Sequence, residues 1–99
     1  MTELDVVALI PAKPGSEDVV RDALTTLGAA TQEHTGCLRY ELFESGAAPG
    51  TFVTVERWRA PEDLDAHMAT EDIATALAAV EGHLAGDIAI HPLQPVTSA

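Results

Sequence analysis

The stretch Gly36-Cys37-Leu38-Arg39-Tyr40-Glu41-Leu42, followed by Thr51-Phe52-Val53-Thr54-Val55-Glu56-Arg57-Trp58, decides the fold of this chain. Both runs are rich in residues that favour strands, and a short connection ending in Pro49-Gly50 separates them, which predicts a β-hairpin. Every second residue of a strand faces the same way. The two sets expected to share a face within their strands are Leu38, Tyr40 and Leu42 on the first strand, and Phe52, Thr54, Glu56 and Trp58 on the second.

Helical patterns flank the hairpin on both sides. Upstream, apolar residues recur every three or four positions from residue 17 to about His34, with Ser16 as a candidate N-cap and Gly36 beyond the end. Downstream, Pro61 suits a first helical turn. A second cap at Thr70, followed by Glu71-Asp72, predicts that this helical segment is broken there.

The two ends of the chain each predict a strand. Leu4 to Ala12 contains the continuous apolar run Val6-Val7-Ala8-Leu9-Ile10, typical of a strand buried on both faces, and Pro92 places the strand from Asp87 to Leu93 at a sheet edge. The order strand, helix, strand, strand, helix, strand predicts an α+β, ferredoxin-like βαββαβ fold with a four-stranded antiparallel sheet. We expect a single domain over 1–99, with its core at about 4–93 and a flexible C-terminal tail.

The predicted fold leaves one face of the sheet without helices. Because the first strand is apolar on both faces, and Val53 and Val55 alternate with Phe52 and Thr54, that bare face should be buried against another sheet. A chain of 99 residues also buries only a modest fraction of its surface alone. We therefore expect a symmetric homodimer.

Charge and cysteine content restrict the classes of partner. The formal net charge of −11 opposes binding to phosphate backbones and anionic membranes, so neither nucleic acid nor membrane is an expected partner. A single cysteine excludes an intrachain disulfide, which suits a reducing compartment. The acidic start of the chain is unlike a signal peptide, and no apolar run is long enough to cross a bilayer. These features predict a cytoplasmic location.

Four residues form the candidate site: Tyr40, Glu56, Trp58 and His67. A carboxylate or imidazole in an apolar cavity has a shifted pKa and can take a proton from a phenolic substrate, so Glu56 and His67 are the candidate catalytic bases. Each residue also has a structural interpretation. Glu56 could pair with Arg39 or Arg57, Trp58 could serve only the core, and Tyr40 and His67 could be hydrogen-bonded core or rim residues.

A metal or nucleotide cofactor is not expected. The four histidines, His34, His67, His83 and His91, lie far apart, and none has the paired spacing of a helix-borne zinc site. Neither GxGxxG nor a P-loop occurs. Cys37 has only Arg39 as a nearby basic residue, so a structural thiol is favoured over a nucleophile.

The motifs above resemble the antibiotic biosynthesis monooxygenase family. Its members often carry Gly-Cys-Leu-Arg-Tyr-Glu-Leu, then Phe-Val-x-x-Glu-x-Trp, then a helix with Leu-x-x-His, which are met here by Gly36 to Leu42, Phe52 to Trp58, and Leu64 with His67. The resemblance spans Val6 to about Ile90. It implies a dimeric α+β barrel and an enzyme that oxidises phenols, anthrones or quinols with molecular oxygen, using neither metal nor flavin.

The resemblance sets the leading hypothesis and its alternatives. We expect a cofactor-independent monooxygenase acting on a small aromatic polyphenol, anthrone or quinol, with His67 or Glu56 as base and Tyr40, Trp58 and Phe52 binding the substrate. Haem-degrading relatives carry an Asn in the first strand, where this chain has Val7, and the chain contains no Asn at all. Haem degradation is therefore disfavoured. The alternatives are a non-catalytic dimeric module that binds a small hydrophobic ligand, and an isomerase of a small signalling metabolite.

Overall fold

Three helices and one four-stranded sheet make up the fold of this computed structural model, which describes residues 3–97. The elements in chain order are β1 (Leu4–Pro11), α1 (Glu17–Thr31), β2 (Cys37–Glu44), β3 (Thr51–Trp58), α2 (Pro61–Met68), α3 (Glu71–Val80) and β4 (Ala89–Pro92). The order confirms the predicted βαββαβ pattern, in which α2 and α3 together form the second helical segment.

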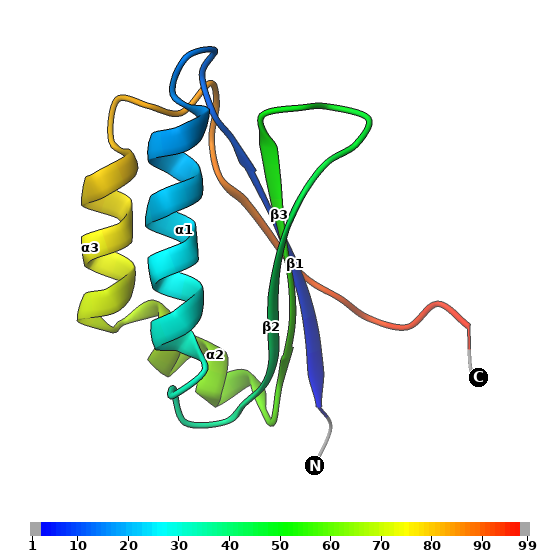
Figure 1. Cartoon of the computed structure of the whole chain (residues 1–99). Helices are drawn as coiled ribbons and strands as arrows, with labels where there is room; N and C mark the ends of the chain where they lie inside the picture. Colours follow the sequence, from blue (N-terminus) through cyan, green and yellow to red (C-terminus); the bar gives the residue numbers. More distant parts are fainter. Residues whose placement is uncertain (1–2, 98–99) are drawn as a thin grey trace.

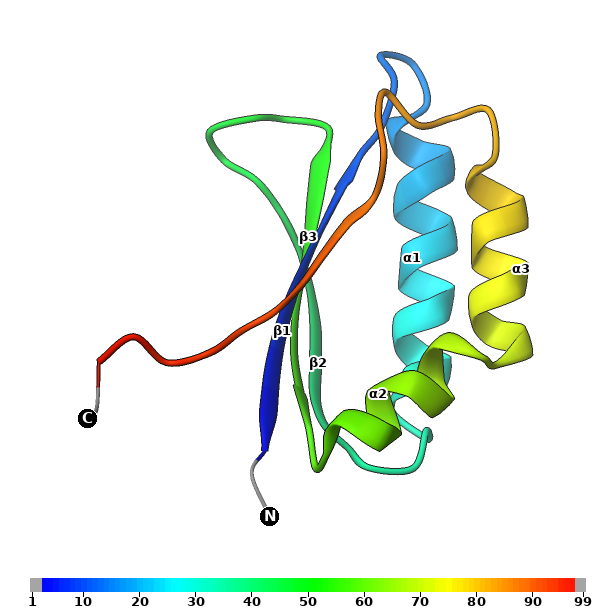
Figure 2. The same cartoon turned by 180° about the vertical axis from the view of Figure 1, so that it is seen from behind.

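The sheet is antiparallel throughout, with the strand order β2-β3-β1-β4. All three helices lie on one face of it, with α1 and α3 side by side and α2 crossing near one end (Figures 1 and 2). In the described part of the chain, the other face carries no helix. This is the ferredoxin-like arrangement, and β4, which contains Pro92, lies at an edge as the sequence predicted.

Local signals explain where the helices begin and end. Pro61 occupies the first turn of α2, and Thr70 Oγ1 accepts a hydrogen bond from Ile73 N at 3.3 Å, so Thr70 is the predicted N-cap that separates α2 from α3. Ser16 does not cap α1, because its hydroxyl lies 2.9 Å from His83 Nδ1 instead. The predicted end of α1 was three residues too far, since the helix stops at Thr31 and His34 lies in the turn that follows.

The helix-covered face of the sheet holds the core. Val6, Ala8 and Ile10 of β1 are buried there, together with alternate residues of β3 from Phe52 to Trp58. On the opposite face Leu9 is 38% exposed and Phe43 is 47% exposed. The apolar run of β1 is therefore covered on one face only.

Two regions depart from the sequence-based picture. A register shift between Cys37 and Arg39 makes Leu38 an extra residue in β2, so Leu38 is exposed while Tyr40 and Leu42 still pair with Glu56 and Thr54. The last strand is shorter than predicted, Ala89–Pro92, and the chain beyond it runs away from the helices (Figure 1). Residues 98 and 99 of the predicted tail lie outside the described residues. Within the described part, no helix has the length and apolar character needed to span a membrane.

Candidate functional site

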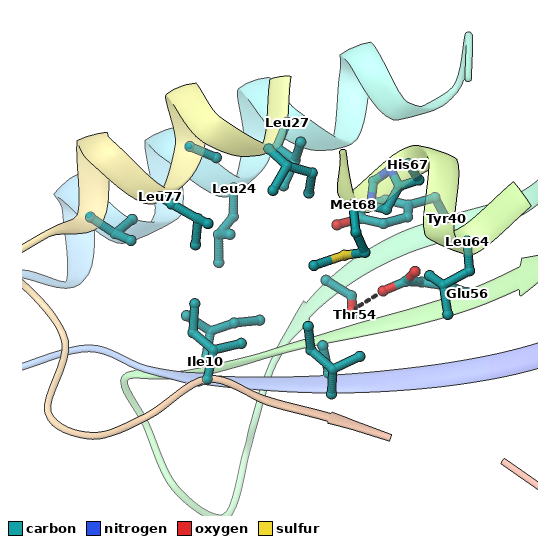
Figure 3. Close-up of a pocket in the computed structure, with 16 residues that line it drawn as sticks. Ile10, Leu24, Leu27, Tyr40, Thr54, Glu56, Leu64, His67, Met68 and Leu77 are labelled. Carbon is teal, nitrogen blue, oxygen red and sulfur yellow. Dashed lines mark hydrogen bonds between the residues drawn. The ribbon is translucent and has the colours of Figure 1, made fainter. Parts of the chain in front are cut away.

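A cavity of about 70 Å³ lies between the helices and the covered face of the sheet. Most of its wall is aliphatic, and Figure 3 shows Leu24 and Leu27 of α1 facing Ile10 of β1 across it. Four lining residues carry polar groups: Tyr40, Thr54, Glu56 and His67. They gather at the end of the cavity next to α2, which gives an apolar chamber with one polar end (Figure 3).

The cavity opens to the surface beside α3 and β4. Three of its lining residues are partly exposed: Met68 at 39%, Leu77 at 48% and Ile90 at 40%. These side chains come from the end of α2, from α3 and from the edge strand β4. Within the described chain β4 is an edge strand that pairs only with β1, so its outer side is not covered by another strand. We call these three residues the cavity mouth.

Glu56 is a buried carboxylate held by two neighbours on its own strand. Thr54 Oγ1 donates to Glu56 Oε2 at 2.6 Å, and Trp58 Nε1 donates to Glu56 Oε1 at 2.9 Å. The three side chains share one face because alternate residues of β3 point the same way. These two donors fix the orientation of a carboxylate that is only 5% exposed.

His67 sits at the polar end of the cavity and has a hydrogen-bond partner on the outside. Its Nδ1 lies 2.8 Å from His34 Nδ1, and His34 Nε2 lies 2.8 Å from Asp72 Oδ2. Its ring also packs on Trp58, with 4.7 Å between ring centroids. Burial and the charge that His34 can carry lower the pKa of His67 to about 4, although Asp72 acts in the opposite direction. His67 is therefore a neutral imidazole at pH 7, able to accept a proton.

Tyr40 completes the polar end as a donor. Its ring centroid lies 5.9 Å from that of His67, and its register partner across the hairpin is Glu56. Burial raises the pKa of the Tyr40 phenol above its usual range, and the charge of Glu56 adds to this effect. The phenol keeps its proton at pH 7, so it can donate a hydrogen bond to a bound oxygen atom.

The structure brings together most of the residues singled out from the sequence. Tyr40, Glu56 and His67 line the cavity, whereas Trp58 and Phe52 are not among its lining residues. Trp58 is fully buried behind Glu56 and His67 and contacts both. Phe52 packs in the apolar core, with the Arg21 guanidinium 5.3 Å from its ring centroid. The structure thus places the Phe52 ring in the core and not on the cavity wall.

The alternative ion pairs of Glu56 do not form. Arg39 pairs with Glu41, and Arg57 Nε donates to Asp5 Oδ1 at 2.8 Å. Both arginines lie on the helix-free face, which the parity of β2 and β3 separates from Glu56. The Cys37 thiol has its pKa raised by burial, as expected for a structural thiol.

Three polar residues of the site were missed by sequence reasoning: Thr54, His34 and Asp72. Thr54 had a signal, since it shares the face of Glu56 two residues away. His34 and Asp72 had none, because they follow α1 and begin α3, and only the packing of these helices brings them together. Among residues 3–97, no group of three or more His, Cys, Asp or Glu side chains is arranged to hold a metal ion.

Comparison with known proteins agrees with this architecture. The family model for antibiotic biosynthesis monooxygenase matches residues 4–85. Rv0793 from Mycobacterium tuberculosis is 30% identical over 94 residues, which cover 95% of this chain and 92% of that protein. In the structural comparison, Rv0793 is 28% identical with a TM-score of 0.88, covering 99% of both chains. The chain belongs to the antibiotic biosynthesis monooxygenase family.

Two further solved structures share the fold over nearly their whole length. PA3566 from Pseudomonas aeruginosa is 28% identical with a TM-score of 0.88, covering 98% of this chain and 97% of that one. A crystal structure of an antibiotic biosynthesis monooxygenase is 31% identical with a TM-score of 0.87, covering 95% of this chain and 99% of that one. The resemblance identified from the hairpin and helix motifs is confirmed at the level of the family.

Proposed function

We propose that this protein is a cofactor-independent monooxygenase that oxidises a small, neutral aromatic polyphenol, anthrone or quinol with molecular oxygen. One observation carries the proposal: a neutral His67 and a protonated Tyr40 face the same apolar cavity. A base and a hydrogen-bond donor at one end of a water-poor chamber are what deprotonation of a bound phenol requires. Membership of the monooxygenase family supports the same activity.

The cavity wall favours a substrate that carries no charge when it binds. No Lys or Arg occurs among its lining residues, and Glu56 already places a carboxylate there, so an anionic ligand would be repelled. The volume of about 70 Å³ is smaller than the roughly 150 Å³ that accommodates benzene in an engineered apolar cavity. An aromatic substrate must therefore extend into the mouth and displace Met68 and Leu77.

The proposed reaction begins with transfer of a substrate hydroxyl proton to the base. Of the two candidates, His67 is favoured, because both oxygens of Glu56 already accept hydrogen bonds. Tyr40 would hold the resulting aryloxide by donating to its oxygen. The anion then gives one electron to O2, the two radicals combine to a peroxide, and loss of water leaves one oxygen atom on the product as a carbonyl.

Oxygen uptake with a panel of quinols, anthrones and polyphenols tests the proposal. The wild-type protein should consume O2 faster than the autoxidation blank, and 18O2 should place one labelled atom in the product. His67→Gln is the matched variant and should lose most of the protein-dependent rate. A panel with no protein-dependent uptake would contradict the proposal. Ligand-induced thermal stabilisation without turnover would instead favour a module that binds small hydrophobic molecules.

The proposed enzyme is a homodimer formed through the helix-free face of the sheet. That face carries Leu9, Phe43 and Val53, of which Leu9 and Phe43 are 38% and 47% exposed. The register aligns Val53 with both of the others, so the three form one apolar row across β1, β3 and β2. Burying this row against its symmetry copy removes apolar surface from water on both subunits.

A further inference from the structure

We propose that His34 and Asp72 form a proton relay with His67, which sets the tautomer of His67 and moves a proton out of the cavity to His34 when the substrate is deprotonated. The inference rests on the proposed function, in which His67 is the base. It concerns two residues, one in the turn after α1 and one at the start of α3, that do not line the cavity.

Hydrogen-bond distances link Asp72, His34 and His67 into a chain of contacts. His34 Nε2 lies 2.8 Å from Asp72 Oδ2, and a carboxylate can only accept, so Nε2 of His34 carries a proton. In the proposed relay His34 carries only this proton at rest, so its Nδ1 is bare. This atom lies 2.8 Å from His67 Nδ1, so His67 must donate from Nδ1. The proton-free nitrogen of His67 is therefore Nε2.

The three groups lie in order between the cavity and solvent. His67 lines the inner cavity, and it also lines a hollow on the outer surface together with His34 and Glu33. The side chain of His34 is 12% exposed and that of Asp72 is 49% exposed. Exposure thus rises along the chain, from a histidine that is 3% exposed to a carboxylate in contact with water.

The proton transfer conserves atoms and changes only N–H and O–H bonds. The substrate hydroxyl proton moves to His67 Nε2, and the Nδ1 proton of His67 moves to His34 Nδ1. His34 becomes an imidazolium beside the Asp72 carboxylate, which stabilises it. Reversal of both steps returns the proton when the peroxide loses water. The positive charge therefore resides on His34, outside the cavity, and not on His67 next to the aryloxide.

Other charges around His67 do not replace this partner. Titratable groups surround His67 on several elements. They are Tyr40 and Glu56 on the sheet, Glu33 and His34 after α1, Asp63 on α2 and Asp72 on α3. Asp63 is paired with Arg59 at 2.9 Å, and Glu56 is bound by Trp58 and Thr54. Among residues 3–97, only His34 lies within hydrogen-bond distance of a ring nitrogen of His67.

The test reads the tautomer of His67 directly by 1H–15N NMR of the imidazole nitrogens, without any substrate. In the wild-type protein at pH 7, His67 should be protonated at Nδ1 and bare at Nε2. Protonation at Nε2 in the wild type overturns the relay, whatever the protein catalyses. The relay survives if the tautomer is as expected but no quinol is oxidised, in which case the proposed function alone fails.

Variants separate the relay from simple packing. His34→Gln should raise the pKa of His67, because the charge that His34 can carry is gone. Asp72→Asn should keep the hydrogen bond to His34 while removing the carboxylate charge that stabilises the His34 imidazolium. Each should lower kcat, but by less than the roughly 100-fold expected for loss of the base itself. Glu71→Gln and His91→Gln are the matched controls and should leave kcat unchanged. Equal kcat in Asp72→Asn and Glu71→Gln would overturn the relay.

Discussion

Trp58 Nε1 donates a hydrogen bond to Glu56 Oε1 at 2.9 Å, although the two residues are only two positions apart on one strand. The bond runs along the covered face of β3, where Trp58 is fully buried. It keeps the indole ring beside the imidazole of His67, 4.7 Å between centroids. Trp58 therefore contacts two cavity groups without lining the cavity, and we expect it to position both of them.

Trp58→Phe tests this role. The variant keeps an apolar ring but leaves Glu56 with one donor fewer, so the free energy of unfolding should fall by about 1–3 kcal/mol. Urea denaturation followed by circular dichroism measures the change, because the variant lacks the only tryptophan. In the double-mutant cycle with Glu56→Met, which removes both acceptor oxygens, the two losses should be less than additive. Strict additivity would show that the bond contributes nothing.

The choice between His67 and Glu56 as base can be decided by matched substitutions. His67→Gln should lower kcat by about 100-fold or more, the usual scale for loss of a general base. Glu56→Gln should lower it less, because Glu56 is engaged by Thr54 and Trp58. Trp58→Phe should also cost less than loss of the base. The opposite ranking of the two Gln variants, with both dimers intact, would assign the base to Glu56.

The sequence was sufficient for the fold because its local signals agree with one another. Strand parity predicted which residues share a face with Tyr40 and with Glu56, and the hairpin register pairs these two residues. Thr70 marked the break between α2 and α3. Parity failed to predict the exposure of Leu38, because the register shift inserts an extra residue there and no residue type in the sequence indicates such a shift. The family resemblance supplied the role of His67, which helix spacing alone left open.

The outer half of the site could not be predicted for a physical reason. His34 was placed in a helix that in fact ends at Thr31, and the turn after it directs the imidazole toward α2. Asp72 lies 38 residues further along the chain and meets His34 only through packing of α1 against α3. Contacts between residues on separate elements depend on tertiary packing, which has no periodicity in the sequence.

The shifted pKa of His67 predicts how stability depends on pH. An unfolded histidine takes a proton near pH 6.5, but folded His67 takes one only near pH 4, so the unfolded state binds more protons in between. This group therefore leaves stability unaffected above about pH 7 and lowers it as the pH falls through that window. Between pH 7 and pH 5 the stability advantage of the wild type over His67→Gln should shrink by about 2 kcal/mol.

Urea denaturation at pH 7, 6 and 5 measures this difference, since the carboxylates common to both proteins cancel. His91→Gln is the matched control, at an exposed histidine of β4, and should follow the wild-type curve. Parallel pH dependences for the wild type and His67→Gln would show that His67 is not held neutral by the fold.

Assembly through the helix-free face is tested by placing one charge in its apolar row. Val53 lies between Leu9 and Phe43 in the register, so Val53→Asp puts a carboxylate at the centre of the proposed interface while leaving the helix-covered core untouched. A stable interface buries about 800 Å² on each partner, and an unpaired charge at its centre is not tolerated. By analytical ultracentrifugation at micromolar concentration, the wild type should sediment as a dimer and Val53→Asp as a folded monomer.

Val19→Asp, at a side chain 40% exposed on α1, is the matched control and should remain dimeric. A wild-type protein that sediments as a stable, well-folded monomer would refute the proposed assembly.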